Sequence, residues 1–357
     1  MSLTVRVLHM LISDLFKKKP LIFGFKCILI AAICLVLNYL FKNDVGSYTR
    51  VMLSELYSEE NIDVLFVGAS HTYRSFDTDL IEKETGLNCF NAGSSSQQLQ
   101  GSYYLIKEAN EKCGVKRVLL DVTFSMQQLE SPGAVQTYIL TDYMHDGANK
   151  KKYLWESFGV DGLINDFFPL LHGISLTPKT AVAHLTGEYR NNSYKYLSFD
   201  DEEYRGQGFV YNYNIYQGND YEPEVTLEGQ LFSDFSAKYL FDIIEYCKTN
   251  SIQLILCEPP MPDGLLSREN GFQTYVDEVR KIAGENEIGY WEFNLAKPDF
   301  LHLEKDCFCD NNHLNGHGAE LFSHSVARLL MAEETVNCFF DSYAEKMENN
   351  PDGTFFE

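Results

Sequence analysis

The segment 61–71 constrains the fold more than any other part of the sequence, which there reads Asn-Ile-Asp-Val-Leu-Phe-Val-Gly-Ala-Ser-His. Ile62 to Val67 is a short apolar run broken by one aspartate, which is typical of a buried strand in a parallel sheet. The run ends at Gly68, and Ser70 and His71 follow. Open α/β sheets bind ligands at the carboxyl ends of their strands, so Ser70 and His71 are candidate site residues. The alternative is that Ser70 only caps the next helix.

A second polar group lies near the other end of the chain, where residues 310–318 read Asp-Asn-Asn-His-Leu-Asn-Gly-His-Gly. These residues precede a predicted helix from about Gly316 to Leu330. Asp310 and His313 are three apart, and in a tight turn this spacing lets the carboxylate hold the imidazole in one tautomer. The free ring nitrogen can then take a proton from a serine hydroxyl. The sequence thus offers a nucleophile, an acid and a base in the order Ser70, Asp310, His313.

Three short motifs together resemble blocks of the SGNH/GDSL hydrolases, over about residues 60–125 and 235–330. They are Gly68-Ala69-Ser70-His71 after the first strand, Asn91-Ala92-Gly93 after the second, and Asp310-Asn311-Asn312-His313. The resemblance implies a serine hydrolase without a cofactor, in which Ser70, His313 and Asp310 are catalytic. It also implies that the backbone N–H groups of Ser70 and Gly93 bind the oxyanion. One block is missing, because the third strand is followed by Asp121-Val122-Thr123-Phe124 and not by Gly-x-Asn-Asp.

Among the members of this superfamily, the chain most resembles the membrane-anchored ones that act on cell-envelope polymers, such as the DltD-like and alginate-acetylation proteins. They imply that the substrate is an acylated polysaccharide or glycopolymer of the cell envelope, carrying O-acetyl or D-alanyl esters, and that a membrane acyltransferase is a candidate partner. Hydrolysis and acyl transfer both remain open. Three further residues are candidates for substrate binding, namely His71, Ser94 and Glu258.

A run of 21 residues, Leu21 to Phe41, is apolar except for Lys26, Asn38 and Tyr39, and its length suits a bilayer-spanning helix. Lys17, Lys18 and Lys19 precede it, which predicts a cytosolic N-terminus, with the main domain outside the cytoplasm. A cleaved signal peptide and a buried core helix are the alternatives, although no small-residue cleavage site follows Phe41. The net charge of −22 argues against binding to nucleic acid.

Alternating strands and helices predict a doubly wound, flavodoxin-like three-layer α/β sandwich of about five parallel strands. The expected strands are Ile62–Val67, Asn88–Asn91, Lys116–Phe124, Ile252–Cys257 and Gly289–Asn294. The predicted organisation is a cytosolic segment 1–20, an anchor 21–41, a linker helix within 42–60, the α/β domain 61–331 and an acidic extension 332–357. An insertion at about 126–232 interrupts the domain and is rich in tyrosine. Its aromatic rings either stack on sugars or form the core of a cap.

Two other functions compete with the serine hydrolase. His313 and His317 are four apart, and His302, Cys307 and Cys309 are near, so a zinc hydrolase is conceivable. Against it, the predicted helix begins between the two histidines, and no metal site is expected. The second rival is a non-catalytic, membrane-anchored binding or accessory protein for polymer acylation, which the missing asparagine block favours. Cys89 and Cys257 fall in predicted strands and are interpreted as small core residues.

Overall fold

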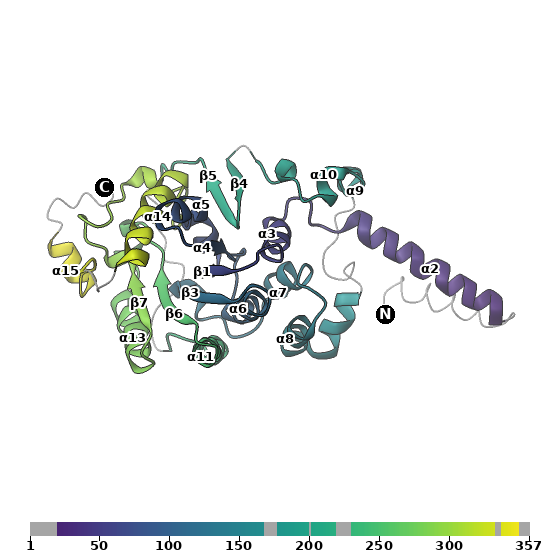
Figure 1. Ribbon diagram of the computed structural model, residues 1–357, viewed down its shortest axis with the longest axis horizontal. Coiled ribbons are helices and arrows are strands. Elements are labelled where there is room, and N and C mark those ends of the chain that lie inside the picture. The colour runs from purple at the N-terminus through teal and green to yellow at the C-terminus, as the bar shows by residue number, and fades with distance from the viewer. Residues whose placement is uncertain (1–19, 168–176, 200, 219–229, 333–336, 350–357) are drawn as a thin grey trace. The chain divides into compact units, whose positions relative to one another are not determined.

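The computed structural model describes residues 20–167, 177–199, 201–218, 230–332 and 337–349 (Figure 1). The chain divides into two units, one drawn from residues 1–45 and 167–193 and the other from 46–166 and 194–357. The first contains the helices α2 (Pro20–Phe41), α9 (Pro178–His184) and α10 (Gly187–Arg190). The lysines expected to set the membrane orientation lie outside the described residues, as do residues 333–336 and 350–357 of the acidic extension.

Helix α2 is the apolar segment predicted from the sequence. Among the described residues it is the one helix whose length and composition would allow it to cross a membrane, over Ile22–Phe41. None of that window is buried within the protein, which argues against the core-helix alternative. A membrane anchor and a signal sequence both remain compatible with it.

Polar contacts join α9 to the end of α2 within the first unit. The Tyr39 hydroxyl donates to the His184 carbonyl at 2.7 Å, and His184 Nε2 lies 2.8 Å from Asp44 Oδ1. Tyr189 donates to the other Asp44 oxygen at 2.9 Å. The predicted insertion is therefore not one piece, because its described residues 177–193 group with the apolar helix.

The second unit is built on a five-stranded sheet in the order β2–β1–β3–β6–β7, with every neighbouring pair parallel. The strands are β1 (Ile62–Val67), β2 (Cys89–Asn91), β3 (Val115–Asp121), β6 (Gln253–Glu258) and β7 (Gly289–Glu292). All five predicted strands are thus confirmed, with ends shifted by a few residues. The apolar run of β1 is central because both of its edges are paired.

The two faces of the sheet pack into two separate cores, which gives the three layers expected from the sequence. Leu65 and Val67 of β1 belong to one core, while Val64 and Phe66 belong to the other, as the two-residue period of a strand requires. The first core is completed by α3 (Tyr48–Leu56), α6 (Leu99–Cys113), α11 (Asp234–Thr249) and α13 (Phe272–Glu285). The second is completed by α5 (Thr78–Thr85) and α14 (Gly316–Met331). Figure 1 shows the sheet between α14 and α5 on one side and α6, α11 and α13 on the other.

Helix α3 occupies the place of the expected linker helix, but it is part of the domain core. Val51, Leu53 and Leu56 are completely buried and pack in the first core. The remaining elements of this unit are α4 (Ser70–Ser75), α7 (Ala134–Thr141), α8 (Ala148–Phe167), β4 (Glu202–Gly206), β5 (Phe209–Asn212), α12 (Asp263–Leu266), α15 (Tyr343–Glu348) and four short 3-10 helices, Phe124–Met126, Tyr194–Tyr196, Phe293–Leu295 and Lys305–Cys307. The antiparallel hairpin β4–β5 comes from the predicted insertion and packs against α4 and α14.

The nine cysteines are all free thiols in the structure. Cys89 and Cys257 are fully buried in β2 and β6, which confirms their interpretation as core residues. Burial raises the pKa of the Cys89 thiol to about 12, so this group is neutral and unreactive at pH 7.

A pair of carboxyl groups is buried at the ends of β6 and β7. Glu258 and Glu292 are in register on these neighbouring parallel strands, and both residues are buried. Neither Glu258 carboxyl oxygen has a hydrogen-bond partner within the described part of the chain. Burial, followed by the charges of Glu292 and Asp121, raises the pKa of Glu258 well above its ordinary value, so Glu258 folds as a neutral acid.

Glu258 is therefore expected to make the protein less stable as pH rises. Its stabilising effect is complete below the unfolded pKa of about 4.3 and is lost as pH rises toward the higher folded pKa. The free energy of unfolding should fall between pH 5 and pH 8, by up to about 1.4 kcal/mol per pH unit for this one proton. Glu258→Gln should flatten that fall, as measured by urea unfolding of the full chain in detergent. Glu285→Gln, at an exposed position, should leave the pH slope unchanged; equal slopes in all three proteins would contradict the assignment.

Candidate active site

The end of β1 delivers Ser70 to the carboxyl edge of the sheet. Gly68 is required at this turn, because a Cβ there would come within 2.3 Å of the Asp121 Cβ and of the Thr72 hydroxyl. Helix α4 then begins at Ser70, with Ala69 in the N-cap position and no side-chain cap. The alternative reading of Ser70 as an N-cap is therefore wrong, and its hydroxyl is free to bond elsewhere.

The second half of the site is a turn that leads into α14. Asp310 Oδ1 accepts hydrogen bonds from the backbone N–H groups of Asn312, at 2.9 Å, and His313, at 2.7 Å. Asn315 then caps α14 by accepting from the Gly318 N–H at 3.0 Å. The spacing of three between Asp310 and His313 thus closes a local turn that orients both side chains, as the sequence predicts.

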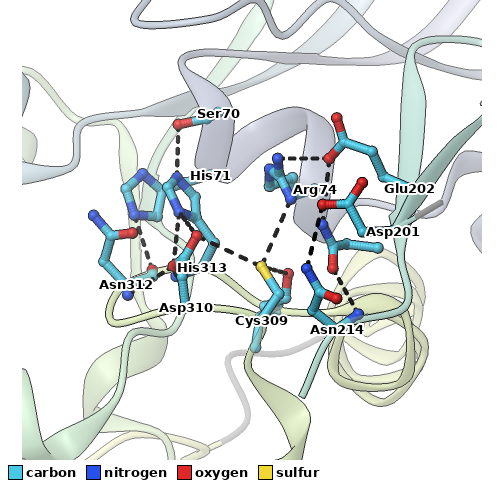
Figure 2. A network of polar contacts seen from close by, with 12 residues as sticks. Ser70, His71, Arg74, Asp201, Glu202, Asn214, Cys309, Asp310, Asn312 and His313 are labelled. Carbon is cyan, nitrogen blue, oxygen red and sulfur yellow. Dashed lines mark hydrogen bonds and ion pairs between the residues drawn. The ribbon is translucent and has the colours of Figure 1, made fainter. Parts of the chain in front are cut away.

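The structure brings Ser70, His313 and Asp310 into one hydrogen-bonded row (Figure 2). Ser70 Oγ lies 2.7 Å from His313 Nε2, and His313 Nδ1 lies 2.9 Å from Asp310 Oδ2. An ionised carboxylate only accepts, so Nδ1 carries the ring hydrogen and Nε2 is left to accept from the serine hydroxyl. This arrangement can remove a proton from Ser70 and so create an oxygen nucleophile.

The carboxyl group of Asp310 is held in its ionised form. Burial alone raises its pKa, but the hydrogen bonds from the His313 ring and from the backbone of Asn312 and His313 outweigh burial and leave the pKa below its ordinary value. Asp310 therefore stays charged throughout the neutral range and can stabilise an imidazolium at His313.

His71 packs behind the triad and has no open face toward solvent. Its ring is buried and stacks on the His313 ring with centroids 4.5 Å apart and planes inclined by 26°. His71 Nε2 lies 3.1 Å from the Asn312 carbonyl, which can only accept, so Nε2 carries the hydrogen. Burial, and then the neighbouring His313, lowers the pKa of His71 to about 3, so the ring is neutral at pH 7. The substrate-contacting role expected for His71 does not fit this buried position.

Replacing His71 by phenylalanine should slow catalysis without weakening substrate binding. The aromatic ring is retained for stacking, but the Asn312 carbonyl loses its donor, and the turn that holds His313 loosens. A buried hydrogen bond is worth about 1–2 kcal/mol, which predicts a roughly tenfold fall in kcat at nearly constant KM. Steady-state kinetics on an acyl ester measure this, with His302→Phe as the control at an exposed position. A parent-like kcat in His71→Phe would show that the contact with Asn312 does not position the base.

The glycine motif after β2 is close to α4, but the backbone N–H of Gly93 already donates a hydrogen bond. A Cβ on Gly93 would come within 2.8 Å of the Tyr73 nitrogen, so the turn needs glycine to approach α4. The Gly93 N–H donates to Asn91 Oδ1 at 3.0 Å, which leaves the expected oxyanion donor satisfied within the protein. Asn91 also donates to the carbonyls of Thr72 at 2.9 Å and Phe76 at 3.1 Å. Asn91 thus connects the glycine turn to α4, a role that no local sequence motif indicates.

The other two expected substrate contacts are also buried. Ser94 is 1% exposed, and its hydroxyl lies 2.9 Å from that of Thr49, so it joins the turn to α3. Glu258 is 0% exposed and belongs to the carboxyl pair described above. Ser94 follows the end of β2 as predicted, and Glu258 is the last residue of β6, but both residues are buried and neither lies on an open surface.

Asp121, at the end of β3, supports the turn that carries Ser70, at the place where the sequence resemblance led us to expect an asparagine block. Its carboxylate accepts from the hydroxyls of Thr72, at 3.1 Å, and Thr123, at 2.6 Å. The side chains at the end of this strand are therefore used to hold α4 in place.

A second polar network flanks the triad on its other side (Figure 2). Arg74, one helical turn after Ser70, forms an ion pair of 2.7 Å with Glu202 from the β4–β5 hairpin. Its other nitrogen lies 3.6 Å from the Cys309 sulfur, which lies 3.6 Å from Asp310 Oδ2. Burial and the adjacent Asp310 raise the pKa of the Cys309 thiol to about 12, so it is not a thiolate nucleophile. The network links the hairpin to both halves of the site, and no local motif signals it.

The alternative zinc site does not form among the described residues. His317 is exposed on α14, whereas His313 faces Ser70. Within the described ranges no group of three or more histidine, cysteine, aspartate or glutamate side chains is placed to hold a metal ion.

No protein-family profile matches the chain, and no curated protein matches it. Among solved structures, it is similar to a lipolytic protein of the G-D-S-L family from Desulfitobacterium hafniense, with 15% identity, a TM-score of 0.38 and coverage of 75% of this chain and 99% of that one. A GDSL-like lipase from Bacteroides thetaiotaomicron gives 11% identity, a TM-score of 0.36 and coverage of 80% and 98%. An acylhydrolase from Bacteroides fragilis gives 11% identity, a TM-score of 0.35 and coverage of 77% of this chain and 91% of that one. Independently of these similarities, the parallel sheet and the hydrogen-bonded Ser70, His313 and Asp310 have the arrangement that the SGNH/GDSL resemblance of the sequence motifs implies.

Proposed function

We propose that the chain is a serine esterase or acyltransferase of the SGNH type that works through an acyl-Ser70 intermediate. The observation that carries the proposal is the 2.7 Å contact between Ser70 Oγ and His313 Nε2, with Nδ1 of the same ring held by Asp310. A serine, a histidine and a carboxylate in this order serve acyl transfer. The carboxylate orients the imidazole and stabilises its charged form, and the imidazole takes the proton of the serine hydroxyl.

The reaction follows from these contacts in two balanced steps. Ser70 Oγ bonds to the ester carbonyl carbon while its proton passes to His313 Nε2, and the C–O bond to the leaving alcohol breaks as that alcohol takes the proton. Water or a sugar hydroxyl then gives its proton to Nε2 and attacks the acyl carbon, and Ser70 Oγ regains a proton as it leaves. The first acceptor makes the protein an esterase and the second an acyltransferase.

The oxyanion requires donors beside the nucleophile. The Ser70 N–H opens α4 and has no acceptor among the described residues, so it is available to a developing oxyanion. The Gly93 N–H would become a second donor if it left Asn91 Oδ1 on substrate binding. Each such donor is worth roughly 3 kcal/mol to the transition state.

We further propose that α2 anchors the protein in the cell membrane with the main domain outside the cytoplasm. The apolar length of α2, and the lysines that precede it in the sequence, support this orientation. That location, together with the resemblance to membrane-anchored polymer-acylation proteins, favours O-acetyl or D-alanyl esters of envelope glycopolymers as substrates. A membrane acyltransferase is then a candidate partner that supplies or receives the acyl group.

Two measurements test the proposal. The full chain in detergent should react with a fluorophosphonate at Ser70, because only an activated serine reacts quickly, and it should release acid from an acylated oligosaccharide. Adding an unacylated oligosaccharide separates transfer from hydrolysis, because a transferase then yields a newly acylated sugar in place of free acid. Protease added to intact cells should digest the domain beyond residue 45; full protection would contradict the orientation.

A non-catalytic accessory protein is the second candidate. The internal bond of the Gly93 N–H favours it, as does the use of the third strand's end by Asp121. Such a protein would bind acylated polymer without reacting with the fluorophosphonate. A folded wild-type chain that fails to react therefore selects this candidate over the enzyme.

A further inference from the structure

Helix α8 is a folded-back pair of arms, although its residues run continuously from Ala148 to Phe167. Gly159 breaks it with φ 59° and ψ −135°, which is outside the helical range. Lys150 and Asp166 form an ion pair of 2.6 Å, whereas 16 residues of straight helix would separate them by about 24 Å. A Cβ at Gly162 would come within 2.5 Å of the Leu154 carbonyl oxygen, so the two arms press against each other.

One side of this hairpin is anchored to the α/β unit. Tyr153 is buried and stacks on Tyr104 of α6 with ring centroids 4.9 Å apart. Phe158 stacks on Tyr138 of α7 at 5.3 Å, and Asn165 donates to the Tyr138 hydroxyl at 2.8 Å. The position of both arms is therefore fixed by packing and hydrogen bonding.

Four apolar side chains of the hairpin are left open to solvent by the described residues. Trp155 on the first arm is 55% exposed, and the second arm exposes Val160 by 58%, Leu163 by 36% and Ile164 by 47%. The last three are spaced i, i+3 and i+4, so they form one stripe along their arm. We call Trp155, Val160, Leu163 and Ile164 the α8 apolar face. An exposed indole and an aliphatic stripe on a rigid hairpin mark an interaction surface.

Two chain connections between the α/β unit and the segment that contains α2 indicate what this face contacts. Six residues, 42–47, join the end of α2 to the start of α3, which allows a separation of at most about 25 Å. At the other end, ten residues, 168–177, join α8 to α9 and allow at most about 40 Å. Because α9 is bonded to the end of α2 through His184, both connections lead from the α/β unit to the segment that contains the apolar helix. A surface tethered twice to a bilayer-spanning helix meets lipid at a high effective concentration.

We propose that the α8 apolar face rests in the interfacial layer of the phospholipid bilayer that α2 spans. Tryptophan is enriched at this depth, because its ring is apolar and its N–H finds polar partners among the headgroups. The aliphatic stripe enters the acyl boundary as the apolar face of an interfacial helix does. The inference rests on the membrane anchoring proposed above, and it gives the α/β unit a second contact with the membrane.

The chain has two tryptophans, Trp155 and Trp291, which allows a direct test. The full chain carrying Trp291→Phe is reconstituted into phosphatidylcholine vesicles with or without bromine on the upper acyl carbons. Bromine quenches only an indole that touches the lipid, so the Trp155 emission should fall at least twofold. The matched control is Trp155→Phe, whose remaining Trp291 lies in β7 and should keep its emission. If Trp291→Phe misfolds, the bromine quenching of Trp155 is obtained instead by subtracting the emission of Trp155→Phe from that of the wild type.

A third variant separates this inference from the anchoring on which it rests. Leu35→Trp, in a chain lacking both native tryptophans, reports whether α2 lies in the bilayer. Quenching of the indole at position 35 without quenching of Trp155 would overturn the docking of α8 and leave the anchor intact. Quenching at neither position would overturn both. Quenching of Trp155 that is reduced by Ile164→Asp would support the proposed face.

Discussion

Ser70→Ala is expected to lower kcat/KM on an acylated oligosaccharide by roughly 10⁴-fold or more while the protein stays folded. The hydroxyl lies 2.7 Å from His313 Nε2, so its removal takes away the atom that we propose forms the acyl-enzyme. Ser70 is partly exposed at the first position of a short helix and caps nothing, so the loss of one oxygen should change stability little. Activity assays paired with thermal melting measure the two effects.

Ser75→Ala is the matched control for this experiment. It removes a hydroxyl from the same helix, five residues from the nucleophile, and should retain most of the activity. The fluorophosphonate should label Ser75→Ala and not Ser70→Ala. If Ser70→Ala remains folded and hydrolyses the ester at the parent rate, then Ser70 is not the nucleophile and the site serves binding only.

The parts of the site that could be predicted from sequence are those encoded by local spacing. The apolar run of β1 and the glycine after it place Ser70, and the Asp310–His313 turn closes through hydrogen bonds within four residues. Each signal is complete within one short segment. The strand ends then meet because the sheet is parallel, so the pattern of strands was enough to predict that the segments come together.

The parts that could not be predicted depend on partners distant in the sequence. His71 contacts Asn312 across 241 positions, and Arg74 pairs with Glu202 across 128. Burial also could not be predicted from position, because Ser94 and Glu258 lie at the carboxyl ends of strands, where site residues are expected, and yet both are buried. The fold-back of α8 depends on the one positive φ at Gly159, in a segment whose composition predicts no hairpin.

His313→Ala should be about as damaging as Ser70→Ala, because a base without its nucleophile and a nucleophile without its base are equally inactive. The double variant should lose little beyond either single one, since the two residues act as a unit. Independent contributions would instead multiply the losses. Kinetics of the four proteins that form this cycle distinguish the two outcomes.

Asp310→Asn should be less damaging, because Asp310 orients the ring and supports the imidazolium without bonding to the substrate. The asparagine amide can offer a hydrogen to Nδ1, which would favour the tautomer that carries its proton on Nε2 and cannot accept from Ser70. We expect a loss of roughly 10²- to 10⁴-fold in kcat with little change in KM. A loss confined to KM would place Asp310 in substrate binding.

His317→Ala completes the comparison, because it removes an exposed imidazole on α14, four residues after His313 and outside the triad. It should leave kcat within about a factor of two, the range ordinary for a surface change. A chelator such as EDTA should likewise leave the wild-type rate unchanged, since His313 is already occupied by Ser70 on one side and Asp310 on the other. If EDTA and His317→Ala both abolished activity while Ser70→Ala did not, His313 would have to act as a metal ligand. The bond to Ser70 would then belong to the metal-free protein alone, and the zinc hydrolase would replace the serine mechanism.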